Sequence, residues 1–200
     1  MAVTTEQIKE LRDATGVSIM QCKKALEEAD GDMEKAKVIL RKSSAQVAAK
    51  KSDRTLGSGA VQAYVHAGNT VVGVVVLACE TDFVAKNEEF VRLAYDIAMH
   101  VAAMNPQFVS RDEVTPADTQ AAREVFEGEV ANLPADKASK SDDMRKKIVE
   151  GKMDSYLADK VLMEQAFVKD PSVTIGGLIA SATQKFGEKI EVVQMKRFTV

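Results

Sequence analysis

The sequence has no tryptophan, only two cysteines and no long hydrophobic run. Cys22 and Cys79 are too few for a disulfide framework in a chain of 200 residues, so we expect reduced thiols, as in a cytosolic protein. The longest apolar run, residues 71–79, is too short to cross a bilayer. The first residues lack the charged start and apolar core of a signal peptide. These absences predict a soluble, cytoplasmic protein that is not embedded in a membrane.

No charge of one sign dominates the chain. The formal net charge is −3, which gives no bulk attraction to nucleic acid or to an anionic membrane surface. Hydrophobic residues make up 46% and charged residues 28%, which is ordinary for a helix-rich globular protein. We therefore expect no direct nucleic-acid partner.

The side chains needed for common enzyme chemistries are also scarce. His66 and His100 are the only histidines, and no Cys-His catalytic pattern surrounds either cysteine. Two Cys and two His without paired spacing do not make a zinc site. The glycines of Gly57-Ser58-Gly59 lack the lysine of a phosphate-binding loop. The sequence therefore predicts no enzyme, no resident metal and no cofactor.

Residues 1–44 are predicted to form a small helical domain with three helices. Thr4 and Gln7 have capping-box spacing, and Asp32 is placed to cap the third helix. The second helix carries an apolar stripe at i, i+3, i+4 and i+7, made by Cys22, Ala25, Leu26 and Ala29. So small a module is marginal by surface-to-volume arithmetic, and modules of this kind commonly serve as docking surfaces.

Residues 45–59 are predicted to be a basic, partly helical linker. Lys50, Lys51 and Arg54 lie among small and polar residues, and the segment ends in glycine and serine. A nucleic-acid-binding arm is the alternative, but no aromatic residues alternate with the basic ones, so we favour the linker.

Residues 60–200 are predicted to form the core domain of an α+β protein, with helices packed on an antiparallel three-stranded sheet. Strands are expected over 60–66, 71–79 and 189–199, the first two joined by a turn at 67–70. Helices are expected after Asn87, after Thr115, after Ser141 and near 174–186, with a chain break at Asp170-Pro171. The strand over 71–79 is so apolar that we expect both of its faces to be covered.

The most informative segment follows that strand: Cys79-Glu80-Thr81-Asp82-Phe83-Val84-Ala85-Lys86-Asn87. It places a large apolar side chain, Phe83, beside an acid, Asp82, in a strand-to-helix connection. Such connections lie on the surface and often carry function. From the residues alone, Phe83 either covers the top of its own sheet or is presented to a partner, and the first interpretation is the more common one.

Two segments resemble a known family. Residues 11–26 (Leu-Arg-Asp-Ala-Thr-Gly-Val-Ser-Ile-Met-Gln-Cys-Lys-Lys-Ala-Leu) and 80–87 (Glu-Thr-Asp-Phe-Val-Ala-Lys-Asn) are similar, in the same order, to two conserved segments of elongation factor Ts. The length is similar to the short form of that family, which has a single core repeat. Directly upstream, Leu77-Ala78 departs from the polar residues that the family usually carries there, which could alter how the following loop is braced.

The resemblance implies a guanine nucleotide exchange factor for elongation factor Tu, acting without covalent chemistry. It implies that Thr81, Asp82, Phe83 and Val84 contact that partner, with Asp82 and Phe83 intruding near its Mg²⁺ and phosphate site to promote GDP release and Mg²⁺ displacement.

The same resemblance implies roles for the rest of the chain. The N-terminal module is similar to the ubiquitin-associated type of fold, and Lys23 on its second helix is a candidate contact with the partner. His66 is a weaker candidate, and an exposed histidine beside a turn is an equally good interpretation. A homodimer is expected, in which the last strand pairs across a two-fold axis. The rival hypotheses are an adaptor whose N-terminal module binds ubiquitin-like or nascent-chain ligands, and a thiol-dependent enzyme.

Overall fold

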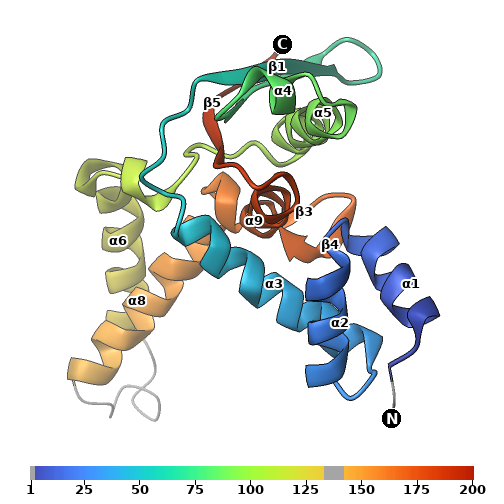
Figure 1. Ribbon diagram of the computed structural model, residues 1–200. Coiled ribbons are helices and arrows are strands. Elements are labelled where there is room, and N and C mark those ends of the chain that lie inside the picture. The colour runs from blue at the N-terminus through green and yellow to red at the C-terminus, as the bar shows by residue number, and fades with distance from the viewer. Residues whose placement is uncertain (1–2, 133–141) are drawn as a thin grey trace.

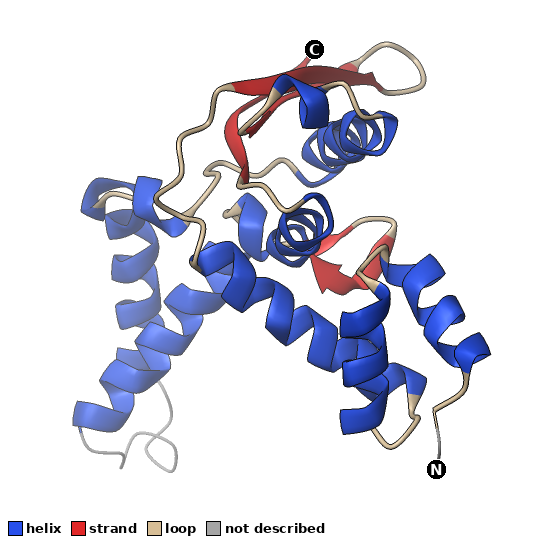
Figure 2. Ribbon diagram, in the orientation of Figure 1, coloured by secondary structure: helices blue, strands red, loops and turns tan. Residues whose placement is uncertain are grey.

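The computed structural model describes residues 3–132 and 142–200 and shows an α+β protein, which confirms the predicted fold class (Figures 1 and 2). A three-stranded antiparallel sheet lies at one side of the molecule and the N-terminal helices lie at the opposite side. The helices between them form the middle of the molecule. No helix among the described residues is long and apolar enough to cross a membrane.

The N-terminal helices begin at the residues whose chemistry predicts it. Helix α1 (Thr5–Thr15) begins with a complete capping box at Thr4 and ends at Gly16, whose φ is 68°. Helix α2 (Ile19–Glu28) is capped by Ser18, and helix α3 (Met33–Ala49) by Asp32. Their shared core contains the predicted stripe and comprises Leu11, Val17, Cys22, Ala25, Leu26, Ala29, Ala36 and Leu40. Helix α3 continues to Ala49, five residues beyond the predicted module, so the start of the predicted linker is helical.

Three strands form the main sheet in the order β1-β2-β5. Strand β1 (Ser58–Val65) pairs antiparallel with β2 (Val71–Cys79), which pairs antiparallel with β5 (Ile190–Thr199). The register between β2 and β5 shifts after Val76, where β5 carries the extra residue Val193. All three predicted strands are therefore present, and the predicted turn at 67–70 joins the first two.

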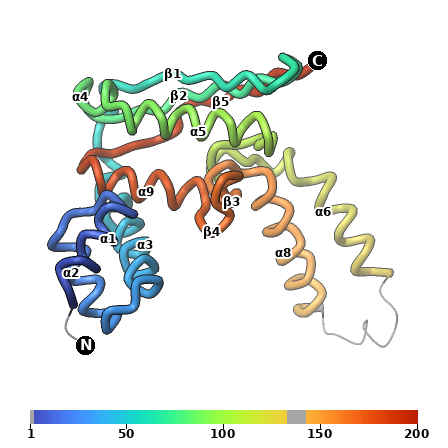
Figure 3. Tube along the Cα trace, turned by 90° about the vertical axis from the view of Figure 1, so that its right-hand side faces the viewer, coloured from blue at the N-terminus to red at the C-terminus, as the bar shows by residue number. Residues whose placement is uncertain are grey.

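One face of the sheet is covered by helix α5 (Glu88–Met104), which begins at Asn87 as predicted. Helix α9 (Ile175–Phe186) lies beneath α5, and α3 lies beneath α9, so the layers stack from the sheet downward in Figure 3. The prediction that both faces of β2 are covered is wrong, because no element formed by residues 3–132 and 142–200 lies over the outer face in Figures 1 and 3. Val74 and Val76 on that face are only half-buried.

A pair of helices extends from the end of the molecule that lies away from α1 and α2 in Figure 3. Helix α6 (Pro116–Ala131) begins at Thr115 as predicted and packs against α8 (Asp142–Ala158). The short 3-10 helices η1 (Arg111–Glu113) and η2 (Leu162–Glu164) flank this pair. The predicted cap at Ser141 lies outside the described residues.

A second, two-stranded sheet was not predicted. Strand β3 (Ala166–Phe167) pairs antiparallel with β4 (Asp170–Thr174), which contains Pro171. Proline lacks the N–H that a central strand donates, but an edge strand tolerates it. The dipeptide Asp170-Pro171 therefore starts an edge strand rather than ending all structure.

Helix α3 packs along α9 and joins the N-terminal helices to the core. The Arg41 guanidinium donates to the carbonyl oxygen of Ser172 at 3.0 Å, and the Ser44 hydroxyl donates to the Gln184 side chain. The N-terminal helices are thus packed on the core rather than suspended from an extended tether.

Candidate functional site

The segment singled out in the sequence forms a compact loop at the end of β2, which we name the motif loop (residues 80–87). It contains a single-turn helix, α4 (Asp82–Ala85), whose N-cap is Thr81. The Thr81 side chain accepts a hydrogen bond from the backbone N–H of Val84 at 3.4 Å. The next N-cap, Asn87, accepts from the N–H of Glu89 and starts α5. Two consecutive caps thus turn the chain from strand into helix.

Neighbouring side chains of α4 point in opposite directions. Phe83 is 81% exposed, whereas Val84 is 4% exposed and packs in the main core beneath the sheet. The first of the two interpretations of Phe83, in which it covers its own sheet, is therefore wrong. An exposed phenylalanine beside a buried valine indicates that the loop is anchored through Val84 and presents Phe83 outward.

Asp82 lies next to Phe83 and is also exposed. Its carboxylate accepts a hydrogen bond from Lys86 Nζ at 2.7 Å, one helical turn later. This bond holds the pKa of Asp82 below its usual range and raises the pKa of Lys86. Asp82 is therefore ionised at neutral pH and accessible to a partner.

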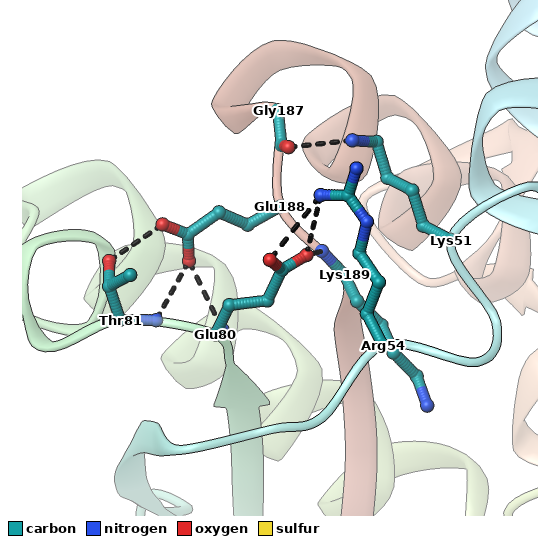
Figure 4. Close-up of polar contacts among 7 residues, drawn as sticks. All are labelled: Lys51, Arg54, Glu80, Thr81, Gly187, Glu188 and Lys189. Atoms are coloured by element: carbon teal, nitrogen blue, oxygen red, sulfur yellow. Dashed lines mark hydrogen bonds and ion pairs between the residues drawn. The ribbon is translucent and has the colours of Figure 1, made fainter.

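Two glutamates brace the base of the motif loop, Glu80 as its first residue and Glu188 after α9, and we name this pair the carboxylate clasp (Figure 4). The Glu188 carboxylate accepts hydrogen bonds from the backbone N–H groups of Glu80 and Thr81 at 3.1 and 3.0 Å, and from the Thr81 hydroxyl at 2.6 Å. Glu80 in turn accepts from the backbone N–H of Lys189 and from Arg54. The N–H of Lys189 and then Arg54 lower the pKa of Glu80.

Sequence reasoning missed Glu188 and Arg54. Glu188 lies 107 residues from Thr81 and follows the glycine that ends α9, where a solvated glutamate is unremarkable. A local pattern contains no signal for such a contact. The antiparallel pairing of Cys79 with Ile190 brings the two loops together.

Cys79 is buried at the end of β2, directly before the motif loop. Its thiol donates to the carbonyl oxygen of Thr81 at 3.2 Å. Burial, together with the negative charge of Glu188, raises the pKa of Cys79, and burial likewise raises that of Cys22. A thiol with a raised pKa is a poor nucleophile at neutral pH. Across residues 3–132 and 142–200, no group of three or more metal-ligating side chains could hold an ion.

Lys23 lies on the exposed side of α2, where its ammonium group is 3.7 Å from the Glu27 carboxylate. One turn earlier, Ile19 and Met20 are 57% and 82% exposed. The first half of α2 therefore combines two exposed apolar side chains with a lysine that pairs with Glu27.

His66 lies at the far end of the β1–β2 hairpin. Its Nδ1 is 3.2 Å from the Tyr64 hydroxyl, and the Tyr64 ring packs edge-on against Tyr95. Strand β1 runs for eight residues between that end and the end near the motif loop, and its seven steps span about 23 Å at 3.3 Å per residue. The structure therefore brings Thr81, Asp82, Phe83 and Val84 together and leaves His66 apart from them.

Comparison with known proteins gives a consistent result. The family model described as "Elongation factor TS" matches residues 33–200. Elongation factor Ts of Herpetosiphon aurantiacus is 46% identical over 200 residues, covering 100% of this chain and 98% of that protein. Those of Desulfotalea psychrophila and Koribacter versatilis are 44% and 42% identical, covering 99% and 89% of their lengths and 100% of this chain.

The chain therefore belongs to the elongation factor Ts family of translation factors, which confirms the resemblance drawn from residues 11–26 and 80–87.

Proposed function

We propose that this member of the elongation factor Ts family is the guanine nucleotide exchange factor for elongation factor Tu and acts by promoting GDP release. The observation that carries the proposal is the 81% exposure of Phe83 on a turn whose next residue, Val84, is buried. Surface connections often carry function, so we interpret this exposed ring on the loop after β2 as the contact with another protein. The proposal includes no covalent step, so the chain is not an enzyme in the ordinary sense.

The proposed mechanism is reciprocal coupling between two ligands of the partner. If binding of this chain weakens the partner's affinity for GDP, GDP weakens the binding of this chain by the same factor. Transfer of the Phe83 ring from water into the partner is worth about 1.5–3 kcal/mol. That free energy corresponds to roughly a ten- to hundredfold effect on nucleotide affinity if it is gained only in the nucleotide-free state.

Asp82 supplies the polar half of the proposed contact. Mg²⁺ requires near-ideal octahedral coordination, so a small displacement of the partner's own ligands weakens its binding. Phe83 would hold the displaced element of the partner, and the adjacent carboxylate of Asp82 would satisfy polar groups that the displacement exposes. Thr81 and Val84 would set the shape of the loop, Thr81 as its cap and Val84 as its anchor.

The N-terminal module is proposed as a second contact with the same partner, through Lys23. Figure 3 shows α1, α2 and α4 at one end of the molecule, with α6 and α8 at the other end. The helices that carry Lys23 and Phe83, α2 and α4, therefore lie at the same end of the molecule, although α4 is on the sheet side and α2 on the opposite side in Figure 1. A partner that spans this end could contact both. His66 lies toward the other end of the sheet, so we propose for it at most a peripheral contact.

A labelled-GDP experiment tests the exchange function. Elongation factor Tu loaded with fluorescent GDP is mixed with excess unlabelled GDP, with and without this chain. We expect the release rate to rise with the concentration of the chain, and Phe83→Ala to reduce the gain by roughly ten- to hundredfold. Val125→Ala, an exposed residue on α6, is the matched control and should behave like the wild type. Unchanged release at micromolar wild-type chain contradicts the function, and full activity of a folded Phe83→Ala variant contradicts the role of Phe83.

The outer face of the sheet, which no described element covers, supports a homodimer that packs through this face rather than one in which the last strands pair. Four of its large apolar side chains are about half exposed or more: Val61, Val65, Val193 and Phe198. Contiguous apolar surface of this kind usually lies in an interface, and a second copy can present the same face across a two-fold axis. Such a dimer would act in the cytoplasm, where translation takes place.

Light scattering tests the dimer. The wild type should give twice the chain mass of 21.7 kDa, and Val61→Glu should give the monomer mass, because it buries a charge in the interface. Val125→Glu, on an exposed site of α6, should remain dimeric. A monomeric wild type at high concentration would contradict the proposal.

A further inference from the structure

We infer that Glu188 is a positioning residue for exchange: it holds the motif loop so that Phe83 is presented to the partner. The inference rests on the proposed exchange function and adds to it a residue outside the motif. It follows from the carboxylate clasp and from the way the motif loop is supported.

Three donors of the motif loop converge on the one carboxylate of Glu188. One of its oxygens accepts from two successive backbone N–H groups, those of Glu80 and Thr81, at 3.1 and 3.0 Å. The other accepts from the Thr81 hydroxyl at 2.6 Å. Hydrogen bonds to an ionised acceptor are shorter and stronger than neutral ones. Two consecutive backbone positions are thereby fixed immediately before α4.

The Thr81 hydroxyl connects this support to the helix that carries Phe83. It donates to Glu188 and accepts from the backbone N–H of Val84. By accepting this second bond, the Thr81 hydroxyl caps α4. A single helical turn is not stable by itself, because nucleation fixes several residues for one hydrogen bond. The orientation of α4 therefore depends on contacts outside the turn: Val84 in the core on one side, and Glu188 at the cap.

Phe83 cannot hold its own position. At 81% exposure its ring gains little from packing within the chain, and its direction follows the backbone of α4. If the cap were free to rotate, the ring would sample many directions, and binding would have to select the productive one. Ordering a loop on binding weakens the interaction that depends on it. Fixing the cap in the free protein removes that cost.

The second half of the clasp holds Glu188 in place. Glu80 accepts from the backbone N–H of Lys189, so each loop supplies a carboxylate to the backbone of the other. Arg54 donates to Glu80 at 3.1 Å, and Lys51 donates to the carbonyl oxygen of Gly187 at 2.7 Å (Figure 4). Both basic side chains come from the segment just after α3. Leu77 and Ala78 are buried in the strand itself, and their apolar side chains donate and accept none of these hydrogen bonds.

The test measures labelled-GDP release as a function of the concentration of the chain. Glu188→Ala should lower the maximal release rate roughly tenfold, with less than about a twofold change in the half-saturating concentration, since the other contacts stay intact. Glu188→Gln keeps one oxygen that can accept the two backbone N–H groups and should recover most of the rate. Asp53→Ala is the matched control, because Asp53 is an exposed carboxylate near the clasp that bonds only its neighbour Ser52 among its described contacts.

A double substitution separates positioning from general destabilisation. If Glu188 acts through Phe83, then Glu188→Ala should lower the rate less than about twofold when Phe83→Ala is already present. Equal losses in both backgrounds, or a full maximal rate in folded Glu188→Ala, would overturn the inference. An inactive wild type would instead contradict the exchange function itself, so the two failures are distinguishable. Thermal unfolding of each variant verifies that it is folded.

Discussion

Substitution of Gly73 by alanine should loosen the packing of α5 on the sheet. Gly73 lies in β2 on the face covered by α5, where the helix approaches the strand closely. A Cβ added at Gly73 would overlap the carbonyl oxygen of Ala98 and come within 2.8 Å of the backbone nitrogen of Ala102. Both atoms belong to the helix backbone, which cannot rotate away as a side chain can. The helix itself must therefore move.

The expected magnitude follows from two opposing terms. Overpacking in a close-packed core costs about 1–3 kcal/mol, and displacement of a whole helix lies at the upper end of that range. Alanine also lowers the conformational entropy of the unfolded chain, which offsets about 0.4–1 kcal/mol of this loss of stability. The net loss is about 2 kcal/mol, which corresponds to a decrease in Tm of about 4–8 °C for a domain of this size.

Thermal unfolding of matched glycine variants tests this expectation. Gly151 lies within α8, and a Cβ added there would meet no atom within 4 Å. Gly151→Ala should therefore raise the Tm by a few degrees, because alanine favours the helix by about 1 kcal/mol over glycine. Equal or higher Tm for Gly73→Ala would refute the close approach of α5 to β2.

Two further predictions concern buried titratable groups. His100 is fully buried, with Nε2 placed to donate to Gln165 at 2.9 Å and Nδ1 to accept from the N–H of Val168, so burial lowers its pKa below the ordinary 6.5. Below pH 6.5 the unfolded chain then binds more protons than the folded chain, so the free energy of unfolding should be lower at pH 5 than at pH 7. This decrease should be smaller in His100→Gln. Both cysteines should react slowly with a thiol reagent in the native protein and rapidly in denaturant, because Cys22 and Cys79 are buried with raised pKa values. Rapid native labelling would contradict that burial.

Features fixed by near neighbours in the chain could be predicted from the sequence. The caps at Thr4, Asp32 and Asn87 bond backbone groups two or three residues away, so a short pattern contains the whole interaction. The same holds for Gly187, whose positive φ ends α9. The three strands of the main sheet were also predictable, because each is marked by composition and bounded by turn residues.

Features that depend on distant pairing could not be predicted in this way. The edge strand β4 was missed because its partner β3 is only two residues long and has no strand pattern of its own. The linker was predicted to be partly helical, but the packing of this helical part, as a continuation of α3, against α9 more than 120 residues later could not be predicted. The exposure of Phe83 was also undecided by sequence, since it depends on which side of α4 faces the core.

A contact residue that is exposed in the free protein and buried only in a complex needs other residues to hold its position before binding. Its own side chain cannot stabilise its position before binding, so neighbours must do so, and they must not occupy the surface that the partner needs. In this chain, Val84 and Glu188 meet both conditions, since one is buried in the core and the other accepts hydrogen bonds only from the base of the loop. Charge also favours this arrangement: the carboxylate of Glu188 satisfies backbone N–H groups directly before a helix start, while the exposed carboxylate of Asp82, paired with Lys86, lies beside Phe83. In the proposed mechanism, support and contact therefore fall to different residues, which is why a substitution at Glu188 can test the first without removing the second.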